Sequence, residues 1–408
     1  MITKKKIIFL NVLLVLGLVL FIILFFNTRH NVIINSDTNN IMNINALTMM
    51  YETSPDSGEY QVSSDVTWAQ EGYVFNSVLS KCENGGVLSW NDETKRVIMS
   101  SNTSDKCYVY YDKVPTLAEY IACLYTSDGE NGLYYHDGDL TNGANDNSYR
   151  YSGANPNNYV CFGSDEDACP VDNLYRIIGV FGNQVKLIKY DYAGSNLLGT
   201  DGTYTSSTTS LGSYYKGSQS TLYFYRWNTE NNNTWSSSKL NIINLNTNFI
   251  NALGDNWSSK IAEVAWQVGG MTYSNGYGVN ASETYSYEVG INTLNTIYNA
   301  KVGLMYVSDY YYGAVPTYWT YPGYSNNGED YDYRAATDSN WLYMRLYEWS
   351  ISRTSTGNEY TFYIFETGHV NSNGVNLGEY AIRPTFYLNS DVTYISGTGT
   401  KIDPYRIQ

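Results

Sequence analysis

Few side chains in this sequence have the types and spacing of an enzyme site. The 408 residues include only three histidines, and neither His136 nor His369 lies in an HExxH pair that would bind zinc. No G-x-S-x-G motif marks a nucleophilic serine. A glycosidase with two carboxylates needs no such signature, so a polysaccharide-acting hydrolase stays open as an alternative. We therefore lean against an enzyme and predict no catalytic residue.

Five cysteines could form disulfides or act as thiols. Outside the cytoplasm cysteines tend to pair. The nearest pairings are Cys82 with Cys107 and Cys161 with Cys169. The first would close a loop of about 26 residues, worth about 3 kcal/mol in the chain-entropy model. Cys123 is left over, and we interpret it as a buried thiol on a helix.

Acidic clusters raise the question of calcium. The alternation from Asp137 to Thr141 is ligand-like, but Asn142 and Ser148 stand where an EF-hand loop needs glycine and glutamate. The other acidic groups are Asp165, Glu166, Asp167 and Asp172, and Glu329, Asp330 and Asp332. Solvated loops are the simpler interpretation of each group. We name no cofactor and keep calcium as an open alternative.

An aromatic stretch could bind a ligand through its rings. The candidate binding residues are Trp319, Tyr321, Tyr324, Tyr331, Tyr333 and Trp341. Exposed aromatic side chains give contact area at low entropy cost, and loops on a rigid scaffold often carry function. The alternative is that these rings fill the core of a long loop.

An apolar run from Ile7 to Phe26 decides where these side chains act. At about 1.5 Å per residue it gives a helix of about 30 Å, the thickness of a bilayer core. The lysines at 4–6 favour a cytoplasmic N-terminus. A cleaved signal is the alternative, but the run is long and no small-residue cleavage site follows it. We predict a single-pass anchor with the bulk of the chain extracellular.

The net charge of −15 restricts the partners. Residues 1–30 hold four basic and no acidic residues, so the exterior part is more acidic still. Nucleic acid and anionic lipid both require basic patches, and we exclude them as partners. The expected partners are the membrane, through the apolar run, and an extracellular glycan or protein ligand.

We divide the chain into five parts by composition. These are a cytoplasmic tip and anchor (1–30), a polar spacer (31–57), a small β-sandwich module (58–113), a linker helix (114–128) and a head (129–408). Thr116 and Glu119 form a capping box for the linker helix. In the head, two apolar runs flank Gly182-Asn183, which predicts a β-hairpin over 174–189. We also expect a strand over 302–307, a surface loop over 203–220 and a turn at 371–374.

Several strings in the head are similar to a known family. They are Leu-Tyr-Arg-Ile-Ile-Gly (174–179), Lys-Val-Gly-Leu-Met-Tyr-Val-Ser-Asp-Tyr (301–310), Ile-Arg-Pro-Thr-Phe-Tyr-Leu (382–388) and Gly-Thr-Gly-Thr-Lys-Ile-Asp-Pro-Tyr (397–405). They resemble an uncharacterised bacterial surface-domain family that looks related to the C-type-lectin-like fold of formylglycine-generating-type domains. Residues 82–110 similarly resemble small cysteine-bracketed, immunoglobulin-like modules of bacterial surface proteins.

The resemblance implies an α+β, mostly β fold with a C-type-lectin-like head, but not the known chemistry of that fold. Formylglycine-generating oxidases need a reactive cysteine pair in the head, and no cysteine follows Cys169. The calcium motifs of C-type lectins are missing from the head, since Trp90-Asn91-Asp92 lies in the small module. We therefore expect a surface protein for binding or adhesion, with a hydrolase or a purely structural envelope protein as alternatives.

Overall fold

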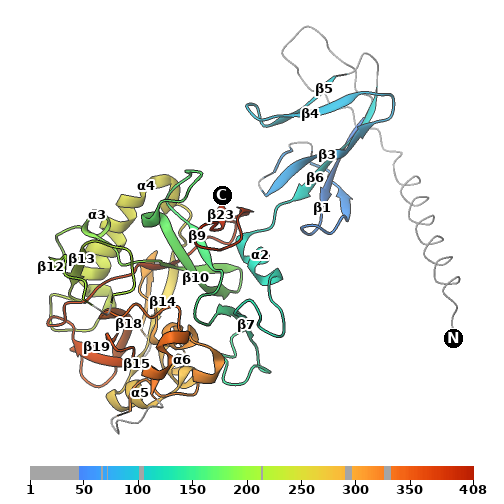
Figure 1. Cartoon of the computed structure of the whole chain (residues 1–408). Coiled ribbons are helices and arrows are strands. Elements are labelled where there is room, and N and C mark those ends of the chain that lie inside the picture. Colours follow the sequence, from blue (N-terminus) through green and yellow to red (C-terminus); the bar gives the residue numbers. More distant parts are fainter. Residues whose placement is uncertain are drawn as a thin grey trace, which may run out of the picture. The chain divides into compact units, whose positions relative to one another are not determined.

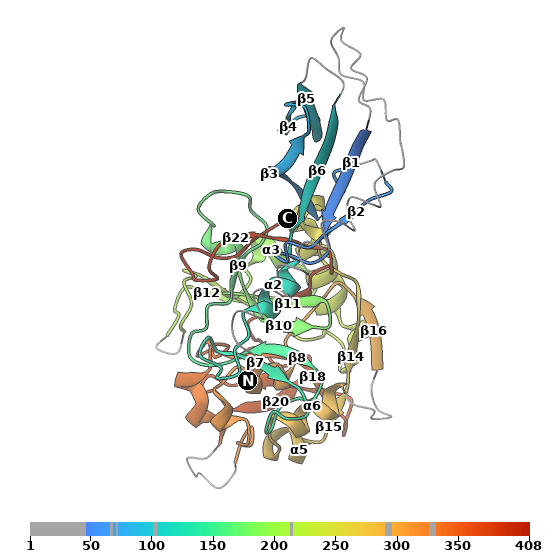
Figure 2. The same ribbon diagram turned by 90° about the vertical axis from the view of Figure 1, so that its right-hand side faces the viewer.

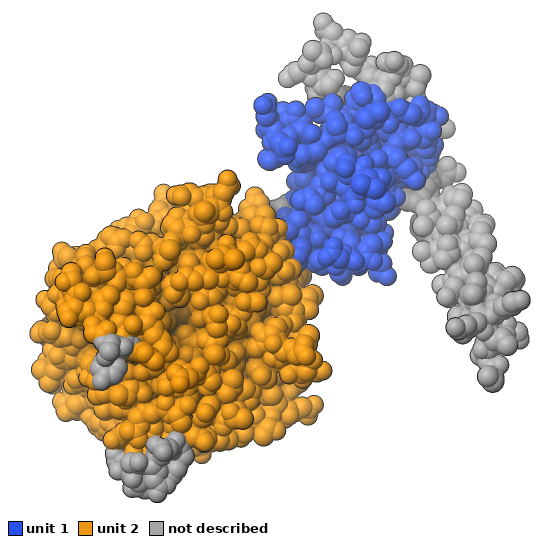
Figure 3. Space-filling view, in the orientation of Figure 1, with its two compact units in different colours: residues 1–115 blue, residues 116–408 orange. Residues whose placement is uncertain are grey.

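The structure is a computed structural model, and it describes residues 46–65, 68–70, 72–100, 105–212, 215–289, 296–325 and 332–408. It contains more strand (35%) than helix (19%), which confirms the α+β, mostly β class. The chain divides into two compact units, residues 1–115 and 116–408 (Figure 3). Within the described ranges, no helix combines the length and the apolar character needed to cross a bilayer. The predicted span Ile7–Phe26 lies outside those ranges.

Unit 1 contains a four-stranded sheet and a separate hairpin (Figure 2). The sheet has the order β2-β1-β6-β3, formed by β1 (Ala46–Glu52), β2 (Tyr60–Val62), β3 (Tyr73–Cys82) and β6 (Lys106–Lys113). The hairpin consists of β4 (Val87–Asn91) and β5 (Arg96–Ser100). Strand β1 runs parallel to β6, and the other pairs are antiparallel.

Strand β1 corrects the predicted spacer. Residues 46–57 belong to the folded module, because β1 pairs with β6 along six residues. Met49 is buried beside Val109, and Leu47 and Tyr51 pack against the same core. These three residues alternate along the strand as a half-buried strand requires, but the asparagine-rich surroundings hid the pattern. The remaining spacer residues, 31–45, lie outside the described ranges.

Unit 2 is organised around one large sheet. Its strands are β7 (Leu133–His136), β8 (Ser148–Tyr151), β10 (Leu174–Phe181), β11 (Gln184–Lys189), β21 (Thr385–Tyr387) and β17 (Val302–Gly303), with β9 (Tyr159–Cys161) also paired to β10. The predicted hairpin is confirmed as β10 and β11. Gly182 supplies its turn with φ of 62°, a conformation that glycine adopts without strain.

Smaller sheets and short helices complete unit 2 (Figure 1). The sheets are β15-β18-β19-β20 (Gly270–Met271, Glu348–Thr354, Tyr360–Ile364, Val370–Gly374), β12-β13 (Tyr204–Thr208, Leu222–Tyr225), β14-β16 (Val264–Val268, Thr296–Ala300) and β22-β23 (Tyr394–Ser396, Arg406–Ile407). The helices are α2 (Leu117–Cys123), α3 (Ser195–Leu198), α4 (Ile250–Ser258), α5 (Tyr273–Gly278), α6 (Ala281–Val289) and α7 (Val307–Tyr312). Shorter or irregular helical segments are η1 (Val171–Asn173), η2 (Trp235–Ser237), η3 (Leu240–Phe249), η4 (Pro316–Tyr318) and η5 (Tyr333–Ser339). Helices α3 and α4 lie at one end of the unit, and α5 and α6 lie at the other (Figures 1 and 2).

Helix α2 begins with the predicted capping box. The Thr116 side chain accepts the N–H of Glu119 at 3.1 Å, and the Glu119 carboxylate accepts the N–H of Thr116 at 2.9 Å. Backbone bonds join this end of the unit to the segment just before β22, since the N–H of Leu117 donates to the carbonyl oxygen of Val392. The first and last segments of unit 2 are thus paired with each other.

Three smaller predictions were wrong in whole or in part. The predicted strand 302–307 is only two residues long, and helix α7 begins at Val307. The predicted turn at 371–374 lies within β20, which pairs with β19, and the predicted loop 203–220 contains β12. In two cases pairing with the neighbouring strand in the chain overrode a weak local turn or loop signal, and in the third a helix start ended the strand.

Candidate functional site

The predicted aromatic surface is mostly core. Trp319 and Tyr333 are fully buried, and Trp341 is 5% exposed. The indole N–H of Trp319 donates to the carbonyl of Ala314, and that of Trp341 donates to the carbonyl of Tyr151, both at 2.9 Å. Buried rings with satisfied polar atoms are typical of a core, so these three residues do not form the exposed surface that we expected; ligand binding through them stays a prediction.

The other described aromatic candidates are not fully exposed either. Tyr321 is half-buried and contacts the ring of Tyr318, with 5.0 Å between centroids. Tyr324 is half-buried and lies 4.5 Å from the ring of His369. Tyr331 lies outside the described ranges. The five described candidates therefore do not form one ligand-binding face.

Both predicted disulfides are present, Cys82–Cys107 in unit 1 and Cys161–Cys169 in unit 2. The interpretation of Cys123 was half right. It ends helix α2 but is exposed, not buried. The buried face of α2 carries Ile121, and a residue two positions later points to the opposite side of a helix with 3.6 residues per turn.

One cluster of two cysteines and an aspartate resembles a metal site, but its potential ligand atoms already form bonds within the protein. Cys82, Asp105 and Cys107 place potential ligand atoms within 4.8 Å of one another. The two sulfurs form the disulfide, and the Asp105 carboxylate accepts the N–H groups of Asn84 and Gly86 at 2.8 and 2.9 Å. This group therefore gives no positive support for calcium.

Two of the acidic residues considered as calcium ligands form hydrogen bonds or ion pairs with neighbouring residues. The Asp137 carboxylate accepts the N–H groups of Asp139 and Leu140, which is the bonding of a turn. Asp332 is buried and forms an ion pair with Arg334 at 2.5 Å. Asp332 also accepts the backbone N–H of Arg334, as the cap of η5.

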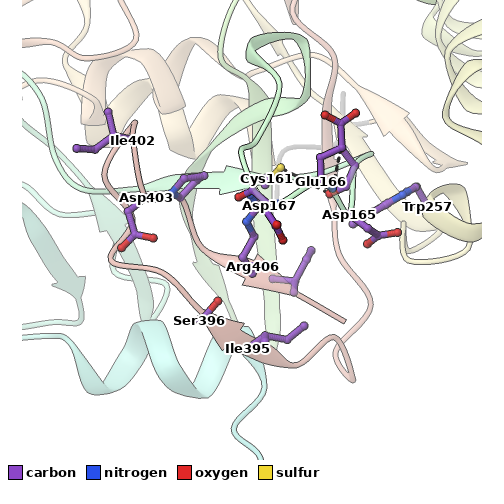
Figure 4. A pocket seen from close by; sticks show the side chains of 13 residues that line it. Cys161, Asp165, Glu166, Asp167, Trp257, Ile395, Ser396, Ile402, Asp403 and Arg406 are labelled. Atoms are coloured by element: carbon purple, nitrogen blue, oxygen red, sulfur yellow. Dashed lines mark hydrogen bonds between the residues drawn. The ribbon is translucent and has the colours of Figure 1, made fainter. Parts of the chain in front are cut away.

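A cavity of about 320 Å³ opens on the surface of unit 2, and we call it the open acidic pocket (Figure 4). Its lining is Cys161, Ser164, Asp165, Glu166, Asp167, Trp257, Ile395, Ser396, Ile402, Asp403, Pro404, Arg406 and Ile407. One wall is the loop closed by the Cys161–Cys169 disulfide. The opposite wall is the C-terminal segment that carries β22 and β23, and Trp257 of α4 lies beyond the acidic loop (Figure 4).

Hydrogen bonds fix the two walls of the open acidic pocket relative to each other. The N–H of Cys161 donates to the carbonyl of Tyr405 at 3.0 Å, and Arg406 Nη2 donates to the carbonyl of Asp167 at 2.6 Å. Asp403 accepts the N–H and the hydroxyl of Thr398 at 3.0 and 2.9 Å, which holds the C-terminal turn. The pocket is thus built on a cross-linked scaffold.

The open acidic pocket combines negative charge with apolar surface. Asp165, Glu166 and Asp167 are exposed, and in the part of the chain that the structure describes none of them forms an ion pair. Ile402 is 96% exposed and Ile395 is 55% exposed. Carboxylates beside exposed isoleucines suit a ligand that carries a cation next to an apolar group.

A second, smaller cavity of about 180 Å³ lies between the large sheet, strand β14 and helices α6 and α7, and we call it the inner cavity. Its lining is Arg150, Phe181, Lys186, Ala265, Gln267, Tyr285, Val289, Tyr306, Asp309 and Tyr387. Lys186 Nζ lies 2.5 Å from Asp309 Oδ2, and Arg150 Nη2 lies 2.5 Å from Asp146 Oδ2. The side chains of Lys186 and Asp309 are each 1% exposed.

Burial and pairing together set the pKa values around the inner cavity. Burial lowers the pKa of Lys186, although Asp309 acts in the opposite direction. Burial alone would raise the pKa of Asp146, but Arg150 and Ser148 outweigh it and lower that pKa to about 2. Burial raises the pKa of Glu288, on the neighbouring helix α6, to about 7. Charged side chains and a carboxyl group with a pKa near neutrality are therefore buried together around the inner cavity.

Sequence reasoning missed Arg150 and Lys186. Lys186 interrupts an apolar run, since Val185 precedes it and Leu187 and Ile188 follow it. All four residues of that run are buried. A lysine inside a strand that is buried on both faces is a signal for a paired, buried charge, and this signal was available.

Comparisons with protein families, with curated proteins and with solved structures found no match for this chain. The resemblance to a bacterial surface-domain family therefore stays a prediction.

Proposed function

We propose that the chain is a membrane-anchored, cell-surface binding protein whose head recognises an extracellular glycan or protein ligand. The open acidic pocket carries this proposal. It is the place where exposed carboxylates and exposed isoleucines meet on a cross-linked scaffold. Rigid scaffolds that present a few polar groups beside apolar surface are typical of binding sites.

The compartment in this proposal rests on two features. The apolar run Ile7–Phe26 has the length of a membrane span, with three lysines just before it and one arginine just after it. The two disulfides support an exterior location, because such bonds persist mainly outside the cytoplasm. The C-type-lectin-like head and the immunoglobulin-like module remain part of the proposal, supported by the strings quoted from the sequence and by the mostly β architecture.

Among the two ligand classes, the pocket favours a protein segment with a basic side chain next to an apolar one. Asp165, Glu166 and Asp167 supply the negative charge for a lysine or arginine. Ile395 and Ile402 supply the apolar contact. Many glycan sites rely on aromatic stacking. Trp257, the tryptophan that lines this pocket, is only 7% exposed and presents little ring surface for it.

The test is binding of the purified full chain, in mild detergent, to a peptide array and to a glycan array. We expect binding to peptides that combine lysine or arginine with an apolar residue, and we expect it to weaken as salt increases. The variant Asp165→Asn/Glu166→Gln should reduce this binding at least tenfold. Binding to neither array would contradict the proposal, and binding only to glycans would reverse the preference between the two classes.

A matched control exists for this variant. Asp128→Asn/Glu130→Gln removes the same two charges from an exposed segment of unit 2 that does not line the pocket. Equal losses in the two variants would mean that net charge, rather than the pocket, drives the binding. A further variant, Ile402→Ser, tests the apolar contact with little risk to the fold, because that side chain is 96% exposed.

A further inference from the structure

A row of residues across four neighbouring strands lies beside the inner cavity. Arg150 on β8 lies opposite Gly179 on β10. Gly179 also lies opposite Lys186 on β11, and Lys186 lies opposite Tyr387 on β21. Residues directly opposite each other in a ladder share one face of the sheet. The two cations therefore flank a position without a side chain, and a Cβ at Gly179 would collide with the carbonyl oxygen of Tyr149.

Aromatic rings surround both cations. Lys186 Nζ lies 4.4 Å from the centre of the Tyr306 ring. The guanidinium of Arg150 lies 4.6 Å from the centre of the Phe181 ring and 5.0 Å from that of Tyr285. Such contacts stabilise a cation without using its N–H groups as hydrogen-bond donors to oxygen.

The cations have more N–H groups than the described residues have acceptors for them. A guanidinium offers five N–H donors and an ammonium offers three. Among the described residues, three hydrogen bonds use them: Arg150 donates to Ser148 and Asp146, and Lys186 donates to Asp309. The contact of Arg150 Nη1 with Asp309 is 3.6 Å, too long for a hydrogen bond. Within the part of the chain that the structure describes, Arg150 Nη1 and two N–H groups of Lys186 thus have no hydrogen-bond acceptor, and they line a cavity in which an acceptor from outside the protein can reach them.

We propose that the inner cavity binds a small organic acid. Its carboxylate accepts hydrogen bonds from Arg150 and Lys186, and its body packs against the surrounding tyrosine and phenylalanine rings. A carboxylate is an acceptor only and fits the fork of a guanidinium, which is what the unpaired donors require. The volume of about 180 Å³ is below the roughly 300–1,000 Å³ of sites for drug-sized ligands, so the ligand is small.

This site is independent of the proposed function. The inner cavity and the open acidic pocket share no lining residue. Failure of either proposal leaves the other in place.

The test measures binding of three acids and their uncharged counterparts to the full chain by titration calorimetry at fixed ionic strength. The pairs are acetate and acetamide, benzoate and benzamide, and glucuronate and glucose. Fluorescence gives a second readout, because the Trp266 ring lies 5.6 Å from Lys186 Nζ. We expect saturable binding of at least one acid, at least tenfold tighter than its counterpart. If no acid binds, or if acid and counterpart bind equally, water fills the cavity and the proposal is wrong.

Variants locate the binding. Lys186→Met/Asp309→Asn removes the ion pair without leaving either charge alone, and it should weaken acid binding at least tenfold. Lys189→Met is the matched control, because Lys189 lies on the same strand, is equally buried and donates to the carbonyl of Asp172 away from the cavity. Unchanged binding in the double variant would overturn the proposal. If that variant does not fold, the proposal is decided by the binding of each acid, relative to its uncharged counterpart, to the natural chain.

Discussion

The two units of this chain are stabilised in different ways. The described core of unit 1 has four buried residues, Met49, Trp68, Val109 and Tyr111, and a disulfide joins β3 to β6. Unit 2 has a large core that also buries ion pairs, Lys186 with Asp309 at 2.5 Å and Arg383 with Glu348 at 2.8 Å. A small unit buries too little surface to be stable without a covalent link, whereas a large unit can accommodate buried charge and cavities.

The largest effect should come from the core of unit 2. Trp319→Ala should lower the free energy of unfolding of that unit by about 3–5 kcal/mol, because it empties a fully buried site. Hydrogen exchange measured by mass spectrometry on the full chain reports each unit separately. Protection of unit 1 should not change. Native-like protection of unit 2 in this variant would show that Trp319 is not a core residue.

The disulfide of unit 1 should matter nearly as much for its own unit. Cys82→Ser/Cys107→Ser opens a loop of about 26 residues and should cost about 3 kcal/mol, enough to unfold a unit with so small a core. The control, Cys161→Ser/Cys169→Ser, should leave unit 1 unchanged. Hydrogen exchange under non-reducing conditions checks both variants. A unit 1 that stays protected without its disulfide would remove the difference between the units.

Buried charge should make unit 2 sensitive to pH. Burial and the nearby Asp309 raise the pKa of Glu288 to about 7 from its ordinary value of 4.5. The folded state holds this proton more tightly than the unfolded state, so stability falls as pH rises from 4.5 through 7, by about 3 kcal/mol. Glu288→Gln should abolish this part of the pH dependence in chemical denaturation of unit 2. Identical pH profiles for both proteins would contradict the assignment.

The smallest effect concerns the start of unit 2. Thr116→Ala removes the cap of helix α2 and should cost about 1 kcal/mol. Thr234→Ala is a matched control, because Thr234 precedes η2 but its side chain makes no capping hydrogen bond. Chemical denaturation of both variants measures the difference. Equal losses would mean that the capping box contributes nothing beyond the threonine itself.

Local patterns predicted the elements whose signals lie within a few residues. The capping box of α2, the hairpin of β10 and β11 and the two short-range disulfides belong to this group. Strand β1 was missed because asparagine-rich surroundings hid its alternation and because its partner β6 lies about sixty residues away. The burial of Trp341 was missed for the same reason, because its indole N–H donates to the carbonyl of Tyr151, 190 residues earlier.

The sequence by itself determined the class of the fold, the disulfide pairs and the acidic character of the chain. The tertiary structure alone decided which side chains share a cavity. The open acidic pocket needs the 161–169 loop beside residues 395–407, and the inner cavity needs Lys186 opposite Tyr387. The physical reason is that strand order and register set these neighbours, and the hydrogen bonds that fix them join residues far apart in the chain.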